Sequence, residues 1–474
     1  MNEGYVNPLT ERYASAEMSR IFSPRYKFET WRRLWLWLAQ EERRLGLPIS
    51  DDAISQMEAS LADIDFEAAR AEEAKTRHDV MAHVRVFGAA APAAKGIIHW
   101  GATSAYVTDN ADLIQMREGL ALVERRLVAV LRGLRDFALA HRDLPALAYT
   151  HFQPAQPTTV GKRAALWASD LLMDLGAARA AREGLRFLGA KGATGTQASF
   201  LRLFDGDSAK VEALDRALAD RAGFVRRQMV SGQTYSRKQD DHVVHALSSL
   251  AQSAHKIGSD LRLLQHEGEL EEPFESHQIG SSAMPYKRNP MRAERVCSLA
   301  RHVIALSLDT AMTAATQWLE RTLDDSANKR IAVPEAFLCS DAILILLDNV
   351  LGGLVVHPEV ARRRLEAEIP FLATEDLMME AVRRGGDRQE LHERLRVHAR
   401  ASADARAATG APADLLDRIA GDAAFGMGRD ALARIATPER LTGRSAEQVE
   451  AFVREELDPA LEGAESAAAA PVRV

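Results

Sequence analysis

The chain has 474 residues, of which 47% are hydrophobic and 27% are charged, and its formal net charge is -7 at pH 7. This length exceeds what one hydrophobic core can hold, so we expect roughly two to four domains of a soluble globular protein. The net negative charge argues against a broad basic surface that would bind nucleic acid. A small anionic substrate would need only a few local cations.

Neither a disulfide framework nor a membrane span is predicted. The two cysteines, Cys297 and Cys339, are too few for a framework of bridges or a cysteine-based metal site, and we expect both to be reduced core residues. The N-terminus has no apolar signal core. The most apolar stretch, 337–356, is interrupted by Asp341 and Asp348, which argues against a span. We expect a cytoplasmic protein.

The predicted elements are helices from the N-terminus onward. Apolar residues between Phe28 and Leu38 recur at steps of three and four, and Gly46 is suited to cap the end of that helix. Two longer apolar series follow at 113–137 and 243–264, each at least about 22 residues, or roughly 33 Å at 1.5 Å per residue. Helices of this length with one apolar stripe pack side by side as a bundle.

Proline placement supports the same conclusion. No proline occurs between Pro157 and Pro273, which is typical of long helices and rare among strands joined by turns. The sequence therefore predicts an all-α fold. Breaks near residues 104 and 355 divide it into an N-terminal helical domain (1–104), a central long-helix bundle (105–356) and a C-terminal helical domain (357–474) with a frayed tail.

Three segments interrupt the helices and are rich in hydroxyl, amide or imidazole groups. They are HWGATSAYVTDN (99–110), YTHFQPAQPTT (149–159) and QIGSSAMPYKRNP (278–290). We predict that all three are non-helical. Loops held by a rigid scaffold are where catalytic groups usually lie, so these segments are the candidate site.

The third segment contains GSSAMPYKRNP (280–290), which resembles the signature loop GSSxMPxKxNP of the fumarase/aspartase superfamily. Further motifs are similar to the adenylosuccinate lyase family within it, particularly its animal-type branch: RYASAEM (12–18), TRHDVMAHV (76–84), THFQPAQPTTVGKR (150–163), KGATGTQASF (191–200), SGQTYSRK (231–238) and RTLDDSANKR (321–330). The resemblance runs from about residue 5 to about residue 460. It implies a long-helix bundle flanked by two smaller helical domains, and the release of fumarate from a succinylated purine nucleotide without a cofactor.

Such an elimination needs a strong base, a cation near the carboxylate that gains charge, and an acid for the departing nitrogen. By its match to the family, Ser281 is the base, and Lys287 with the loop's backbone N–H groups would stabilise its alkoxide. His151 matches the general acid, and Glu294 matches the glutamate that orients it. Gly280 would let the loop move as a lid.

The resemblance also assigns residues to the substrate. His78 lies near the reacting end, and Ser326 and Arg330, four apart on a helix, would present a hydroxyl and a guanidinium to a phosphate. The full set of substrate residues is Arg12, Tyr13, Arg77, Asp79, Thr103, Ser104, Gln233, Asn289, Arg295, Arg321, Ser326 and Arg330. The alternative for Arg321 and Arg330 is pairing with Asp324 or Asp325 on a solvated face.

No metal or cofactor is expected. His78 and His83 are five apart and do not share a helical face, and His242 and His245 lack an obvious third ligand. The glycines of KGATGTQASF suggest a phosphate loop, but its lysine comes first rather than last, so we reject nucleotide-cofactor binding.

One chain is not expected to make one site. Gln233 and Ser281 lie before and after a predicted long helix, and the family architecture is a homotetramer whose sites draw loops from three subunits. Competing interpretations are another fumarate-releasing lyase, such as one acting on argininosuccinate, and a non-catalytic structural relative. The phosphate-directed pair argues against the first, and the intact signature argues against the second.

Overall fold

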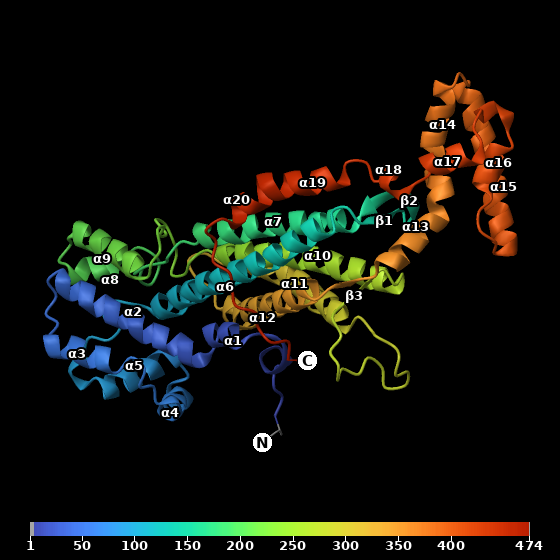
Figure 1. The fold of residues 1–474 in the computed structure, drawn as a ribbon. Coiled ribbons are helices and arrows are strands. Elements are labelled where there is room, and N and C mark those ends of the chain that lie inside the picture. The colour runs from blue at the N-terminus through green and yellow to red at the C-terminus, as the bar shows by residue number, and fades with distance from the viewer. Residues whose placement is uncertain (1–3, 474) are drawn as a thin grey trace.

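Five long helices lie side by side and form the body of the molecule (Figure 1). The computed structural model describes residues 4–473. The five helices are α6 (Ser104–Ala140), α7 (Val160–Gly184), α10 (Lys238–His266), α11 (Met291–Ala315) and α12 (Asp324–Gly352). Both long apolar series of the sequence lie on these helices, and the all-α prediction is confirmed. The strands form two small antiparallel pairs, β1 (Pro145–Thr150) with β2 (Gln153–Thr159), and β3 (Leu270–Glu271) with β4 (Val355–Val356).

The apolar stripes of α6 and α10 explain why these helices are long and continuous. Leu120 and Leu127 on α6, and Ala254 and Ile257 on α10, are completely buried against neighbouring helices. With 37 residues α6 is roughly 55 Å long, and α10 with 29 residues is roughly 43 Å long. Loops at opposite ends of the bundle are therefore far apart within one chain.

The N-terminal helices pack against one side of the bundle (Figure 1). They are η1 (Leu9–Tyr13), α1 (Ala16–Ile21), α2 (Pro24–Arg44), α3 (Asp51–Ala59), α4 (Phe66–Thr76), α5 (Asp79–Ala90) and η2 (Pro92–Ala94). All of them except α4 contribute to the main hydrophobic core of the bundle. The Ser23 hydroxyl caps α2 by accepting a hydrogen bond from the Tyr26 N–H. Gly46 follows the end of α2 with a φ of 105°, which suits the glycine expected there.

The C-terminal helices split into two groups. The first stands across one end of the bundle and has its own hydrophobic core (Figure 1): α13 (Pro358–Leu372), α14 (Thr374–Arg383), α15 (Arg388–Thr409), α16 (Leu415–Ala420), η3 (Ala423–Phe425) and α17 (Arg429–Ile435). The second returns along the bundle: α18 (Pro438–Leu441), α19 (Ser445–Phe452), η4 (Val453–Leu457) and α20 (Asp458–Leu461). The two remaining helices, α8 (Ala198–Leu203) and α9 (Ser208–Arg221), lie beside α2.

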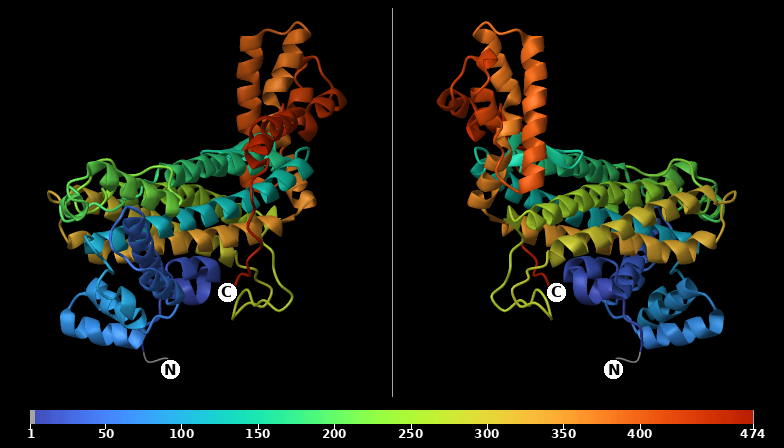
Figure 2. Two further views of the ribbon diagram at one scale, coloured as in Figure 1. Left: turned by 90° about the vertical axis from the view of Figure 1, so that its left-hand side faces the viewer. Right: turned by 90° about the vertical axis from the view of Figure 1, so that its right-hand side faces the viewer.

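The three candidate segments differ in structure. Residues 278–290 form an irregular loop that projects from the bundle on the side away from α13–α17 (Figure 2). Residues 149–159 belong to the β1–β2 hairpin. The prediction for 99–110 is wrong in part, because Ser104–Asn110 form the first turns of α6. The apolar face that buries Ala105 and Tyr106 extends the helix further back than the sequence pattern suggested.

Two other features complete the fold. Cys297 and Cys339 are buried and unpaired, as predicted. Among residues 4–473, no helix combines the length and the apolar character needed to cross a membrane.

Candidate active site

A cleft of about 450 Å³ lies where the first turns of α5, α6 and α12 meet the segment that precedes α10. It brings together eight of the residues that the sequence assigned to the substrate. They are Arg77, His78, Asp79, Ser104, Gln233, Arg321, Ser326 and Arg330. These residues come from four separate stretches of the chain, so the fold alone assembles them.

His78 is positioned by the start of α5. Arg77 ends α4 in the left-handed conformation, with a φ of 55°, and the chain then turns directly into the next helix. His78 occupies the N-cap of α5, where its Nδ1 accepts a hydrogen bond from the Met81 N–H at 3.3 Å. Its Nε2 lies 3.3 Å from the Ser104 hydroxyl. The imidazole therefore joins α5 to α6 at the wall of the cleft.

The two cleft arginines on or beside α12 are already paired with carboxylates. Arg321 donates to Asp325 at 2.8 Å, which is one of the two aspartates proposed as its alternative partners. Arg330 donates instead to Asp79 on α5 at 3.0 Å. Ser326 and Arg330 both lie in the first turns of α12, as the spacing of four predicted.

A buried network of alternating charges forms the floor of the cleft. Arg237 donates two hydrogen bonds to Asp109, at 3.0 and 3.2 Å, and a third to Asp325 at 2.6 Å. Lys329 reaches Asp109 at 3.4 Å and Asp112 at 2.7 Å. The sequence reasoning missed this network. Its signal was present, because Asp109 lies four residues before Leu113, on the apolar stripe of α6.

The network is electrostatically balanced. Burial alone would raise the pKa of the Asp109 carboxyl, but Lys329 and Arg237 hold that pKa below its usual value. Burial likewise opposes the charge of Lys329, yet Asp109, Asp112 and Asp240 raise its pKa above the ordinary one. Asp109 and Lys329 are therefore both favoured in their charged forms, and Arg321 is anchored to this ion-paired network through Asp325.

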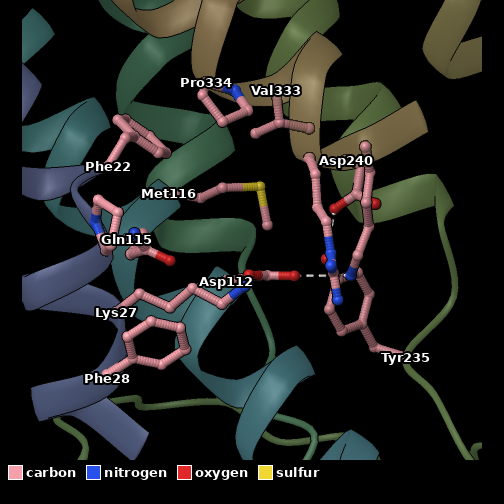
Figure 3. A pocket seen from close by; sticks show the side chains of 13 residues that line it. Phe22, Lys27, Phe28, Asp112, Gln115, Met116, Tyr235, Asp240, Val333 and Pro334 are labelled. Carbon is pink, nitrogen blue, oxygen red and sulfur yellow. Dashed lines mark hydrogen bonds and ion pairs between the residues drawn. The ribbon is translucent and has the colours of Figure 1, made fainter. Parts of the chain in front are cut away.

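A second, smaller cavity of about 250 Å³ adjoins the cleft and shares Lys27, Asp112, Lys329 and Arg330 with it. Figure 3 shows Lys27 and Asp112 on one side of this cavity and Asp240 on the other. Asp240 accepts a hydrogen bond from the Tyr235 hydroxyl at 2.5 Å. Burial raises the pKa of Asp240 to about 6, and Lys329 and Arg237 limit the rise.

His151 lies outside the cleft, at the tip of the β1–β2 hairpin. Thr150 pairs with Gln153, so His151 and Phe152 form a two-residue turn. Both have a positive φ, 54° and 56°, in a type of turn that normally carries Asn-Gly. Left-handed non-glycine residues cost of the order of 1–3 kcal/mol each and gather at functional sites. The turn presents the imidazole to solvent, where it forms no hydrogen bond with any residue within 4–473.

Ser281 and Lys287 also lie outside the cleft, in the projecting loop. The Ser281 hydroxyl oxygen accepts hydrogen bonds from the N–H groups of Ala283 and Met284, at 3.3 and 3.1 Å. Asn289 closes the loop by donating to the Gly280 carbonyl at 2.7 Å. Lys287 is exposed.

The other assigned residues are distributed around the bundle. Thr103 is the N-cap residue of α6, directly before Ser104 of the cleft. Glu294 and Arg295 lie in the first turn of α11, just after the loop. The guanidinium of Arg295 lies over the Tyr13 ring, 5.5 Å from its centroid, and Arg12 is the neighbour of Tyr13 in η1.

The glycine-rich stretch 191–200 has a structural role. Lys191 is buried and pairs with Asp215 at 2.7 Å, and the Ala193 carbonyl accepts a hydrogen bond from Gln233. No group of three or more His, Cys, Asp or Glu side chains suited to hold a metal ion is found within 4–473.

Comparisons with known proteins agree with this architecture. The family described as "Lyase" matches residues 47–305, and the family described as "Adenylosuccinate lyase C-terminus" matches residues 370–452. The fold resembles a fumarate lyase from Mesorhizobium sp. BNC1, with a TM-score of 0.81, 25% identity, and coverage of 96% of this chain and 99% of that one. The long-helix bundle and its matches define a carbon–nitrogen lyase of the fumarase/aspartase superfamily.

Two curated relatives narrow the assignment. Adenylosuccinate lyase from Saccharomyces cerevisiae is 51% identical over 463 residues, which cover 97% of this chain and 96% of the relative. Adenylosuccinate lyase from Schistosoma mansoni is 48% identical over 461 residues, with coverage of 97% and 96%. The chain belongs to the adenylosuccinate lyase family.

Proposed function

We propose that this lyase cleaves adenylosuccinate into AMP and fumarate, and releases fumarate in the same way from succinylaminoimidazole carboxamide ribotide in purine biosynthesis. The observation that carries the proposal is the convergence of eight substrate-assigned residues in one cleft. The cleft offers guanidinium groups to a phosphate and a carboxylate, and amide, hydroxyl and imidazole groups to a ribose and a base.

Ser281 is the base in this proposal. The proton to be removed is bound to the carbon beside a carboxylate and is weakly acidic, so a strong base is needed, and a serine can supply one only as its alkoxide. Two backbone N–H groups already donate to the Ser281 oxygen, and they would stabilise its negative charge. Lys287, in the same loop, supplies a cation for the substrate carboxylate on which charge accumulates. The electron pair left on that carbon then forms the carbon–carbon double bond of fumarate, while the carbon–nitrogen bond breaks and its electron pair leaves with the nitrogen.

His151 is the acid that protonates the departing nitrogen. The strained turn holds its imidazole away from the hairpin, where it can enter a site formed elsewhere. Glu294 is assigned to orient the imidazole and stabilise its charged form. His78 acts from the cleft wall, near the reacting end of the substrate.

We propose that each site is shared between subunits of a homotetramer. Within one chain the cleft lies at the start of α6, and the hairpin follows the other end of that helix, roughly 55 Å away. The loop bearing Ser281 is likewise separated from Gln233 by α10, roughly 43 Å long. A cleft, a loop and a hairpin from three different subunits would complete one site.

We also propose that the protein is cytoplasmic and that its chain divides into three domains, at residues 1–104, 105–356 and 357–474.

The ultraviolet spectrum of adenylosuccinate, incubated with the wild type or with Ser281→Ala, tests the activity and the base together. The wild type is expected to produce AMP, and a tetrameric Ser281→Ala protein is expected not to. No conversion by a folded wild type contradicts the proposed activity, whereas conversion by both proteins contradicts only the role of Ser281.

Mixing two inactive variants tests the sharing of sites. Ser281→Ala and His151→Gln subunits, unfolded together and refolded, are expected to regain part of the wild-type activity, because some mixed tetramers contain a site with an intact serine and an intact histidine. Each variant refolded alone is the control. Mixed tetramers with no recovered activity would show that the two residues serve a site from the same subunit.

A further inference from the structure

Lys27 lies on α2 and lines both the substrate cleft and the adjoining cavity, although neither the motifs nor the comparisons assign it a role. Its side chain is half-buried, and its ammonium lies over the rings of Phe28 and Trp31, 5.7 and 5.1 Å from their centroids. Figure 3 shows the side chain extending from α2 toward Asp112. The rings therefore hold the ammonium at the wall that the two cavities share.

Three other cations of the cleft differ from Lys27 in being paired with carboxylates. Arg321 pairs with Asp325, Lys329 with Asp109 and Asp112, and Arg330 with Asp79. The ammonium of Lys27 forms no hydrogen bond or ion pair with any residue within 4–473. The carboxylates that face it, Asp79 and Asp112, are each already occupied by another cation.

The surroundings of Lys27 leave it short of negative charge. Burial lowers its pKa, Asp112 and Asp79 oppose this effect, and Arg330 and Lys329 add to it. A half-buried ammonium beside two further cations gains most from an anion that enters from the cleft. Ser326 and Arg330, which line the same cleft, are the residues assigned to the phosphate of the substrate.

We infer that Lys27 is a further phosphate-binding residue of the cleft and acts with Ser326 and Arg330. This inference rests on the proposed function. The ammonium contributes a point charge, whereas Arg330 contributes directional donors and keeps one of them on Asp79. The phosphate dianion supplies the negative charge that this wall of the cleft lacks.

The test compares adenylosuccinate with the same compound lacking its 5′-phosphate. Lys27→Met removes the charge and retains most of the apolar stem that packs on the two rings. We expect KM for adenylosuccinate to rise roughly tenfold to a hundredfold, as for a lost hydrogen bond to a charged group, with kcat little changed. For the phosphate-free substrate, kcat/KM of the variant should match the wild type.

Two variants serve as controls. Lys27→Arg keeps the charge and should restore most of the affinity for the phosphorylated substrate. Lys210→Met removes a lysine that lies over Phe204, 6.0 Å from the ring centroid, on α9 and outside the lining of the cleft. It should leave both substrates unaffected. Equal losses for the two substrates in Lys27→Met, or no loss for either, would overturn the inference.

Inorganic phosphate provides a second measurement that needs no turnover. Calorimetric titration of the unliganded wild type should detect phosphate binding, weakened in Lys27→Met and retained in Lys27→Arg. Equal binding to the wild type and Lys27→Met would overturn the inference even if the proposed substrate were wrong. An inactive wild type that still binds phosphate through Lys27 would contradict the proposed function alone.

Discussion

The substrate cleft and the signature loop are built in opposite ways. Residues from five stretches of the chain form the cleft. Its floor is a buried ionic network in which Arg237, the N-cap residue of α10, pairs with both α6 and α12. The loop at 278–290 projects from the bundle, is mostly exposed, and is closed at its base by the bond from Asn289 to Gly280. The geometry of the cleft is therefore fixed by the fold of the chain, whereas the conformation of the loop depends little on that fold.

This difference separates binding from chemistry. The groups assigned to hold the substrate are anchored to long helices, so their geometry exists before the substrate arrives. The groups assigned to transfer protons, Ser281 and His151, lie on an exposed loop and a strained hairpin turn. Assembly of subunits and closure over the substrate would bring them to the cleft. Substitutions in the two regions should therefore have different effects.

The largest expected effect is on the rate of the Ser281→Ala variant. Loss of the base should lower kcat by about a thousandfold, while the dissociation constant of adenylosuccinate stays close to that of the wild type. Stopped-flow turnover and calorimetric binding measure the two quantities separately. If the Ser281→Ala variant also loses affinity for adenylosuccinate, the loop helps to bind the substrate, and binding and chemistry are not separated in this way.

Asp109→Asn should act on stability as well as on binding. It leaves Arg237 and Lys329 buried with less opposing charge, which typically costs roughly 3–5 kcal/mol of the free energy of unfolding. Urea denaturation measures this loss. Asp136→Asn, at an exposed position of the same helix, is the matched control and should change stability by no more than about 0.5 kcal/mol. Equal stability of the two variants would show that the network does not hold the cleft together.

Much of the fold could be predicted because long helices leave a clear pattern in the sequence. The stripes of α6 and α10 and the proline-free stretch were sufficient for the all-α bundle. The start of α6 was misplaced, because the hydroxyl and amide groups between Thr103 and Asn110 have the composition of a loop although the segment is helical. Tertiary burial of Ala105 and Tyr106 overrode that local preference.

The site was predictable only where a motif marked it. The resemblance named the residues that meet in the cleft. Their spacing along the sequence alone does not show that His78 and Arg330 line the same cleft. The ionic floor was missed because Asp109 and Asp240 occupy positions of the apolar stripes. A single charged residue there only interrupts the apolar pattern and does not indicate a buried network. The partners of Asp109 are Arg237, at the N-cap of α10, and Lys329, on α12, and such pairings depend on the assembled fold.

A smaller effect is expected for Gly280→Ala, which changes the loop and leaves the scaffold intact. A Cβ at this position would lie 2.1 Å from the Lys287 carbonyl oxygen, so the base of the loop must shift. A shift of about 1 Å in a catalytic group can cost roughly a hundredfold in rate. We expect kcat to fall by up to that factor with an unchanged melting temperature. Gly176→Ala, at an open position within α7, is the control and should retain wild-type turnover.

A separate effect concerns the pH dependence of stability. Glu42, on α2, is completely buried, and neither of its carboxylate oxygens has a hydrogen-bond partner among residues 4–473. Burial raises its pKa to about 9. The folded chain therefore holds this proton while the unfolded chain, with an ordinary glutamate pKa of roughly 4.3, releases it. Between these two values the stability of the wild type should fall as pH rises, by up to about 1.4 kcal/mol per pH unit.

Glu42→Gln should remove this loss without altering the chemistry. The variant is expected to become progressively more stable than the wild type from about pH 5 toward pH 9, as measured by urea denaturation at each pH. Its pH profile of kcat/KM should match the wild type, because Glu42 lies in the core and outside the lining of the cleft. A stability difference that does not change with pH would mean that Glu42 is already ionised in the folded chain. A shifted pH profile of kcat/KM would instead show that Glu42, in the buried scaffold, affects the groups assigned to transfer protons, Ser281 and His151.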